Sequence, residues 1–245
     1  MRFLPLLLSS LALCATGAVA KPADYAAAVG FKDRPADAVA MDASRHPAEI
    51  LDFMHLKPGM TAYDMITGSG YYAEIMARAV GPKGRVVAFE PASFYTRTKT
   101  GLDALTAREP NVKIETDIAA SLPANTYDFA MIHLNYHDLY WESEKFGVPR
   151  VDPDKVLAAL FASMKKGGIV AVIDHVGPAG DTRAVVDKFH RIDPETVKAD
   201  FKRAGFVLDG ESPLLRNTAD DHTKNVFDPT VKGKTDRFAF RFEKP

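Results

Sequence analysis

The sequence is poor in cysteine and in excess charge, and each scarcity excludes a class of function. The single cysteine, Cys14, lies in an amino-terminal apolar run, so the rest of the chain offers neither a disulfide nor a thiolate metal site. The 31 basic residues nearly balance the 32 acidic ones, and no basic block occurs, so we expect no nucleic-acid partner. The apolar run from Phe3 to Ala15 is too short for a spanning helix, so we expect no stable membrane insertion.

Residues 1–20 are typical of a secretory signal peptide. Arg2 precedes the apolar run, and Ala18 to Ala20 end it with the small-x-small pattern of a cleavage site. Leu13 is too large for the position before a lipid-modified Cys14, so we expect no lipid anchor. The pattern predicts cleavage after Ala20 and a periplasmic or secreted protein.

The stretch from Thr61 to Pro91 predicts a strand, a turn, a helix and a second strand. The apolar run Ala62 to Ile66 is short and bounded by glycine, as a buried strand is. The turn at Gly68 to Gly70 has almost no side-chain bulk. Tyr71 to Val80 has apolar residues at helical spacing, and Arg85 to Glu90 forms a second apolar run that ends in a carboxylate. This is the length of a parallel βαβ unit.

This unit indicates a ligand site. A glycine turn lets the backbone approach a bound molecule, and the free N–H groups of the next helix favour anionic atoms. Glu90, at the end of the second strand, can accept hydrogen bonds from both hydroxyls of a ribose. The dinucleotide pattern G-x-G-x-x-G is absent, because Tyr71 to Ala73 follow Gly70, which weakens a nicotinamide interpretation. In the alternative, the glycines only build a tight turn and Glu90 is a solvated strand end.

The order of acid, glycine turn, helix, strand and second acid resembles motifs I and II of class I S-adenosylmethionine-dependent methyltransferases. The resemblance implies S-adenosylmethionine as the cofactor. It also implies a role for Asp117 near the adenine amine, although Asp117 can equally cap the helix that follows it. The cofactor-binding residues that the resemblance implies are Asp64, Gly68, Ser69, Gly70, Glu90 and Asp117.

The chain is also similar to a group of exported bacterial predicted methyltransferases. That similarity extends to the carboxy-terminal sequence from Asn217 to Arg237. One position departs from the usual motif, which has glycine two residues after the first acid, where this chain has Ile66. We expect this substitution to affect how closely the methionine part of the cofactor approaches.

The alternation of strands and helices along the chain predicts the fold class. It is α/β, with a doubly wound, mostly parallel, seven-stranded Rossmann-like sheet, helices on both faces and an antiparallel edge hairpin. We expect a signal peptide at 1–20, an amino-terminal lead or lid at 21–45 and a methyltransferase-like α/β domain at 46–245. The five further strands are expected at 112–117, 127–134, 169–176, 206–209 and 238–242.

Polar residues follow the fourth and fifth predicted strands, where an α/β sheet places its ligands. His137 is the first candidate base, because histidine titrates near neutral pH, and Asp174 would orient it. His133 and His175 are the second candidates. In the structural alternative, Asp174 and His137 pair only to fasten two loops, since a buried charge needs a partner.

The residues at these strand ends also raise the question of a bound metal ion. A loose similarity to metal-dependent catechol-type O-methyltransferases can be drawn, but one of their carboxylate ligands has no counterpart, so we expect no divalent metal. A three-ligand site of Asp174, His175 and His133 stays open as an alternative. His190 and His222 are minor candidates, since both are expected in solvated loops.

The predicted function is methyl transfer from S-adenosylmethionine to a small-molecule or protein acceptor, with a small-molecule substrate as the expected partner. The alternative is an exported, non-catalytic protein of this fold that binds another ligand or a metal.

Overall fold

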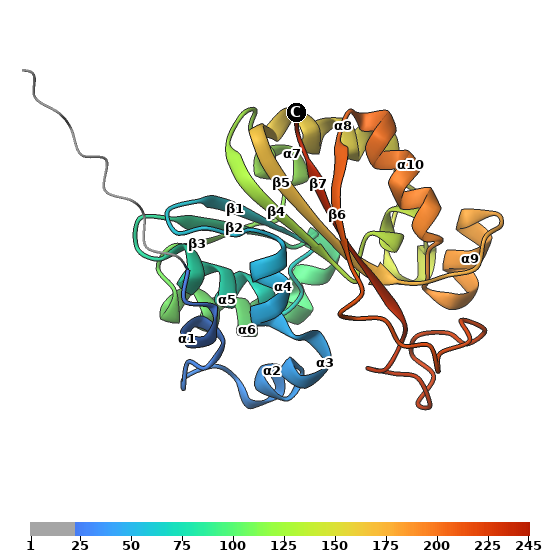
Figure 1. The fold of residues 1–245 in the computed structure, drawn as a ribbon, viewed down its shortest axis with the longest axis horizontal. Coiled ribbons are helices and arrows are strands. Elements are labelled where there is room, and N and C mark those ends of the chain that lie inside the picture. Colours follow the sequence, from blue (N-terminus) through green and yellow to red (C-terminus); the bar gives the residue numbers. More distant parts are fainter. Residues whose placement is uncertain (1–22) are drawn as a thin grey trace, which may run out of the picture.

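The computed structural model describes residues 23–245 and shows one sheet with helices on both faces (Figure 1). The predicted signal peptide lies outside the described residues. Within residues 23–245, no helix combines the length and the apolar character that a membrane crossing requires.

The predicted seven-stranded sheet is confirmed, with the strand order β3-β2-β1-β4-β5-β7-β6. Strands β1 to β5 are parallel to one another, and β7 is antiparallel to both β5 and β6. The two strands of the predicted antiparallel edge hairpin, β6 and β7, pair with each other and are joined by a long connection, residues 213–236. The strands are β1 Thr61–Met65, β2 Arg85–Phe89, β3 Val112–Glu115, β4 Tyr127–His133, β5 Met164–His175, β6 Val207–Ser212 and β7 Arg237–Glu243.

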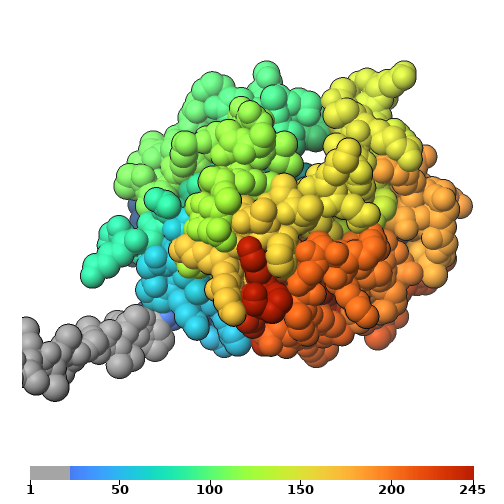
Figure 2. Space-filling model, turned by 90° about the horizontal axis from the view of Figure 1, so that it is seen from above, coloured from blue at the N-terminus to red at the C-terminus, as the bar shows by residue number. Residues whose placement is uncertain are grey.

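The last strand of the chain is inserted between two earlier ones. In Figure 2 the red end of the chain lies between yellow residues and the orange residues of the neighbouring edge. β5 starts at Met164, earlier than predicted, because the helix before it already ends at Ser163.

The helices cover the sheet on two faces (Figure 1). One apolar core lies between the sheet and α4, α5 and α6, and the other lies between the sheet and α8 and α10. The sequence pattern did not predict α9, because this amphipathic helix is only eight residues long. The helices are α1 Tyr25–Val29, α2 Ala36–Ala40, α3 Asp42–Arg45, α4 Pro47–Phe53, α5 Tyr71–Val80, α6 Ala92–Arg108, α7 Ile118–Ser121, α8 Pro153–Ser163, α9 Thr182–Phe189, α10 Pro194–Ala204, and the 3-10 helices η1 His137–Tyr140 and η2 Glu144–Phe146.

The amino-terminal lead is fastened to the rest of the domain. Arg34 donates two hydrogen bonds to the carboxylate of Asp42, at 2.7 and 2.8 Å, and the hydroxyl of Tyr71 donates a third, at 2.7 Å. Tyr71 is the first residue of α5, so this network ties α3 to the helix that follows the glycine turn. Its role as a lid stays a prediction.

The two glycines of the turn are required for different reasons. Both have positive φ, +59° at Gly68 and +87° at Gly70. A Cβ at Gly70 would lie 2.4 Å from Cδ2 of Leu105 on α6, whereas a Cβ at Gly68 would have no atom within 4 Å. Gly70 is therefore needed for packing as well as for its backbone conformation, and Gly68 only for the latter.

We expect Gly70→Ala to destabilise the protein by about 2–4 kcal/mol, because left-handed strain and overpacking against Leu105 add. Gly68→Ala should cost only the strain, about 1–2 kcal/mol. Urea unfolding of both variants measures the difference. Equal losses would contradict the packing role of Gly70.

Two strand ends hold bulky residues in the left-handed region. Ile66 follows β1 with φ of 55°, and Leu134 follows β4 with φ of 58°. Such conformations cost about 1–3 kcal/mol each and concentrate at functional sites. Ile66 thus adopts a backbone conformation that glycine adopts more readily. Both residues lie at the carboxyl edge of the sheet.

Candidate functional site

Two adjoining cavities open at the carboxyl ends of β1, β4 and β5. The smaller has a volume of about 350 Å³ and the larger about 810 Å³. Four residues line both: Met41, Arg45, Leu134 and Asp138. The smaller cavity is otherwise lined by Asp64, Ile66, Thr67, Gly68, Ser69, Tyr71, Tyr72, His133 and Asn135.

The smaller cavity is open at the predicted cofactor turn. Ile66 and the paired tyrosines Tyr71 and Tyr72 line it without filling it. Asp64, the next-to-last residue of β1, lines this cavity, is only 3% exposed, and accepts a 2.6 Å hydrogen bond from the hydroxyl of Thr67. Burial raises the pKa of Asp64 to about 7. The site therefore holds a carboxyl group that titrates near neutral pH.

Three buried polar atoms of this cavity have no hydrogen-bond partner within residues 23–245. They are the hydroxyl of Tyr72, Nε2 of His133 and Oδ1 of Asn135. Asn135 is held in place from its other side, because its Nδ2 donates to the carbonyls of Met65 and Ile66 at 2.7 and 2.9 Å. Buried polar groups without a partner are costly, and all three residues line this one cavity, so the cavity suits a polar ligand.

Two guanidinium groups lie near the junction of the cavities. Arg45 is half-buried over the ring of Tyr71, 4.2 Å from its centroid, and Arg237 is 4% exposed. Arg237 donates to the carbonyl of Ser44 at 2.9 Å and to the hydroxyl of Thr235 at 3.2 Å. Neither arginine forms an ion pair within the described part of the chain. Burial lowers the pKa of each guanidinium, and the two positive charges repel.

Glu90 lies behind the turn and lines neither cavity. Its Oε2 accepts a 2.8 Å hydrogen bond from the amide of Gly68, and burial raises its pKa to about 7. Its predicted contact with a ribose stays a prediction. Asp117 is exposed and accepts a 2.9 Å hydrogen bond from the amide of Ala119, so it caps α7. Of its two expected roles, the structure shows the capping one.

His137 and Asp174 form a buried pair at the inner end of the larger cavity. Nδ1 of His137 lies 2.9 and 3.0 Å from the two carboxylate oxygens of Asp174. Asp174 also accepts from the amides of His137 and His175, at 2.9 and 2.7 Å. Burial alone would lower the pKa of His137, but the charges of Asp174 and Asp138 raise it to about 9. The same pairing holds the pKa of Asp174 below its usual range, against the effect of burial.

The other predicted histidines are separated. Burial lowers the pKa of His175 to about 3, and its Nδ1 lies 2.7 Å from the hydroxyl of Thr235. His133 lines the smaller cavity, and burial holds its pKa well below the usual range. The predicted catalytic histidines are thus divided between the two cavities: His133 lines the smaller one, while His137 and His175 line the larger one.

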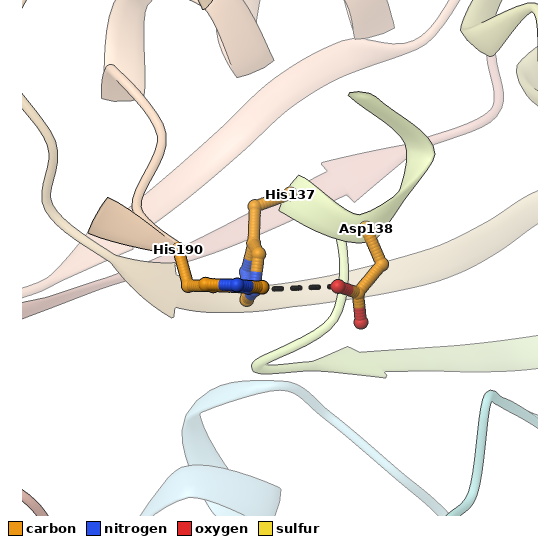
Figure 3. A group of neighbouring side chains, drawn as sticks. All are labelled: His137, Asp138 and His190. Carbon is orange, nitrogen blue, oxygen red and sulfur yellow. Dashed lines mark ion pairs between the residues drawn. The ribbon is translucent and has the colours of Figure 1, made fainter. Parts of the chain in front are cut away.

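His190, which we expected in a solvated loop, lies beside His137 together with Asp138. Figure 3 shows that His190 and Asp138 approach His137 from different segments, at the end of α9 and in η1. Ligand atoms of the three side chains lie within 4.8 Å of one another. Burial, and then the charge of His137, lower the pKa of His190. No spacing or periodicity in the sequence links His190 to the other two residues.

His222, the other minor candidate, contacts Asp236 instead of lining a cavity. Its Nε2 lies 3.0 Å from a carboxylate oxygen of Asp236, and it lines neither cavity.

Comparison with known proteins was made for the sequence and for the fold. A family model described as protein-L-isoaspartate(D-aspartate) O-methyltransferase matches residues 24–119, less than half of the chain. The matched range contains the glycine turn and both acids that carry the sequence resemblance. No curated protein matches the chain.

Solved structures match over most of the chain. A SAM-dependent methyltransferase from Aquifex aeolicus is 22% identical, with a TM-score of 0.60, covering 87% of this chain and 100% of its own. An S-adenosylmethionine-dependent methyltransferase from Mesorhizobium loti is 12% identical, with a TM-score of 0.55, covering 83% and 99%. The [4+2]-cyclase SpnF is 15% identical, with a TM-score of 0.56, covering 83% and 82%. At these identities the likeness shows the fold: this chain has the fold of S-adenosylmethionine-dependent methyltransferases of known structure.

Proposed function

We propose that this protein transfers a methyl group from S-adenosylmethionine, held in the smaller cavity, to an acceptor in the larger one. The observation that carries the proposal is the convergence of unpartnered buried polar atoms from Tyr72, His133 and Asn135 on the cavity beside the glycine turn. A protein that did not bind a ligand there would leave these groups desolvated without compensation.

The groups of the smaller cavity fit the amino-acid end of the cofactor. A ligand carboxylate would find the guanidinium of Arg45 and the hydroxyl of Tyr72. A ligand ammonium would find the carboxylate of Asp64 and Oδ1 of Asn135. Opposite charges are thus available for both ends of a zwitterion within one cavity of about 350 Å³.

The larger cavity fits an acceptor that carries an anionic group. Arg237 is buried there without an ion pair within residues 23–245, and Lys232 and Arg97 also line the cavity. Trp141 and Phe227 give the same cavity an apolar surface. We therefore propose a small acceptor with an apolar body and a carboxylate or phosphate group.

The contact between the cavities provides the geometry for transfer. Displacement at a sulfonium requires the acceptor atom in line with the methyl carbon, so both ligands must meet at one point. Arg45, Leu134 and Asp138 line both cavities and mark that point. In the transfer, the acceptor atom would bond to the methyl carbon, the carbon–sulfur bond would break to leave S-adenosylhomocysteine, and the proton of an O–H or N–H acceptor would pass to water.

The first test is titration calorimetry of the protein with S-adenosylmethionine and S-adenosylhomocysteine. We expect saturable binding of both at one site per chain. If neither compound gives a binding heat, the proposal is wrong and the non-catalytic alternative remains. The fold match to SpnF makes this test necessary, because the same fold is found in a cyclase.

A cleaner test uses Tyr72, whose hydroxyl has no protein partner to lose. We expect Tyr72→Phe to lower affinity for S-adenosylhomocysteine by about 10–100-fold, since one hydrogen bond to the ligand carboxylate is removed. The ligand-free protein should be as stable or more stable, because a buried unpartnered hydroxyl is gone. Calorimetry and thermal unfolding together measure both effects. Unchanged affinity would contradict the placement of the ligand.

A further inference from the structure

We infer that His137, Asp138 and His190 bind a divalent transition-metal ion at the inner end of the larger cavity. The three side chains come from η1 and from the end of α9, and each offers one ligand atom within 4.8 Å of the other two (Figure 3). The inference concerns the ion alone and holds whether or not the chain transfers methyl groups.

The orientation of His137 leaves one nitrogen for a metal. Its Nδ1 is engaged by Asp174, so Nε2 is the free atom, and it lies 3.5 Å from Oδ1 of Asp138. A carboxylate that holds the far nitrogen of a histidine is the usual outer partner at metal sites, because it fixes the ring and raises its basicity. Asp174 is itself held by two backbone amides, so the support is rigid.

His190 is a free ligand rather than a structural contact. The rings of His137, His175 and His222 each have a hydrogen-bond partner. Neither ring nitrogen of His190 has one within residues 23–245. Its ring lies between Trp141 and Phe227, with centroids 5.1 Å away in both cases. Its backbone is held in the left-handed conformation, with φ of 50°. The neighbouring rings and the helix end fix the direction of this imidazole.

The donor set selects the class of ion. Two imidazoles and one carboxylate suit zinc or ferrous iron, whereas magnesium and calcium prefer oxygen ligands throughout. The three protein ligands cluster at one end of a cavity of about 810 Å³, so water or an acceptor atom can complete the coordination. Arg237 and Lys232 line the same cavity, so an anionic acceptor could bind both the ion and these cations.

The single tryptophan of the chain provides a direct probe, because Trp141 packs against His190. The untagged, chelator-treated full chain is titrated with Co²⁺ while tryptophan fluorescence and visible absorption are followed. We expect saturable quenching at one equivalent, cobalt d–d bands, and reversal of both by Zn²⁺.

Two variants test the assignment and one controls for it. His190→Gln and Asp138→Asn should each weaken Co²⁺ binding at least about 10-fold. His55→Gln should bind as the parent does, because His55 is exposed and lines neither cavity. Circular dichroism confirms that each variant is folded. No saturable binding by the parent, or equal affinity in His190→Gln, would overturn the inference.

Discussion

Replacing Arg191 by leucine is expected to lower the free energy of unfolding by about 3–5 kcal/mol, because it leaves a buried carboxylate without its partner. Arg191 is 0% exposed and donates to both oxygens of Asp220, at 2.8 and 3.1 Å. It also donates to the carbonyls of Val176 and Lys224. A single side chain thus joins the end of β5 to the segment between β6 and β7.

Matched variants separate the unpaired charge from general loss of packing. The double variant Arg191→Leu/Asp220→Asn should recover part of the loss, because the remaining amide carries no charge and still accepts from the backbone. Arg150→Leu removes an exposed pair with Glu142 and should change stability by less than about 1 kcal/mol. Urea unfolding at pH 7 measures all three. A loss below about 1 kcal/mol in Arg191→Leu would contradict the structural role of the pair.

The βαβ unit could be predicted because every local signal agreed. Tyr71 to Val80 has the predicted helix bounds, and the two strands differ from prediction by one residue at their ends. Glycine turns, apolar runs and helix periodicity are properties of adjacent residues, so they can be read without knowledge of the fold. The same holds for the polar residues after β4 and β5, which the parallel sheet brings to one edge.

The membership of the site could not be predicted in full, because it depends on distant segments. His190 meets Asp138 only through the turn after α9, and neither sequence spacing nor periodicity links them. That Oδ1 of Asn135 lacks a partner could not be predicted, because it depends on the hydrogen bond that Nδ2 of Asn135 donates to Met65 at the end of β1. Likewise, the sequence does not show that His133 and His137 line different cavities, although they are only four residues apart.

Asp64→Asn should lower the affinity for S-adenosylmethionine by about 100-fold at pH 7.5, because the cofactor ammonium loses a buried charge partner. The parent protein should show the same loss on acidification. The pKa of Asp64 is raised to about 7 by burial, so the carboxyl is protonated below that pH and ionised above it. Only the ionised form attracts the ammonium, so affinity rises with pH and reaches its plateau above pH 7.

For one group of pKa about 7, the affinity at pH 5 should be about 100-fold below the plateau, and Asp64→Asn should lose this dependence. Glu90 titrates in the same range, so Glu90→Gln is measured beside it and must retain the part due to Asp64. Asp24→Asn is the control, because this exposed carboxylate only caps α1 and asparagine caps equally well. Calorimetric titrations at pH 5, 6, 7 and 7.5 give the profiles. A pH dependence in Asp64→Asn equal to that of the parent would show that the carboxylate at the end of β1 does not hold the cofactor.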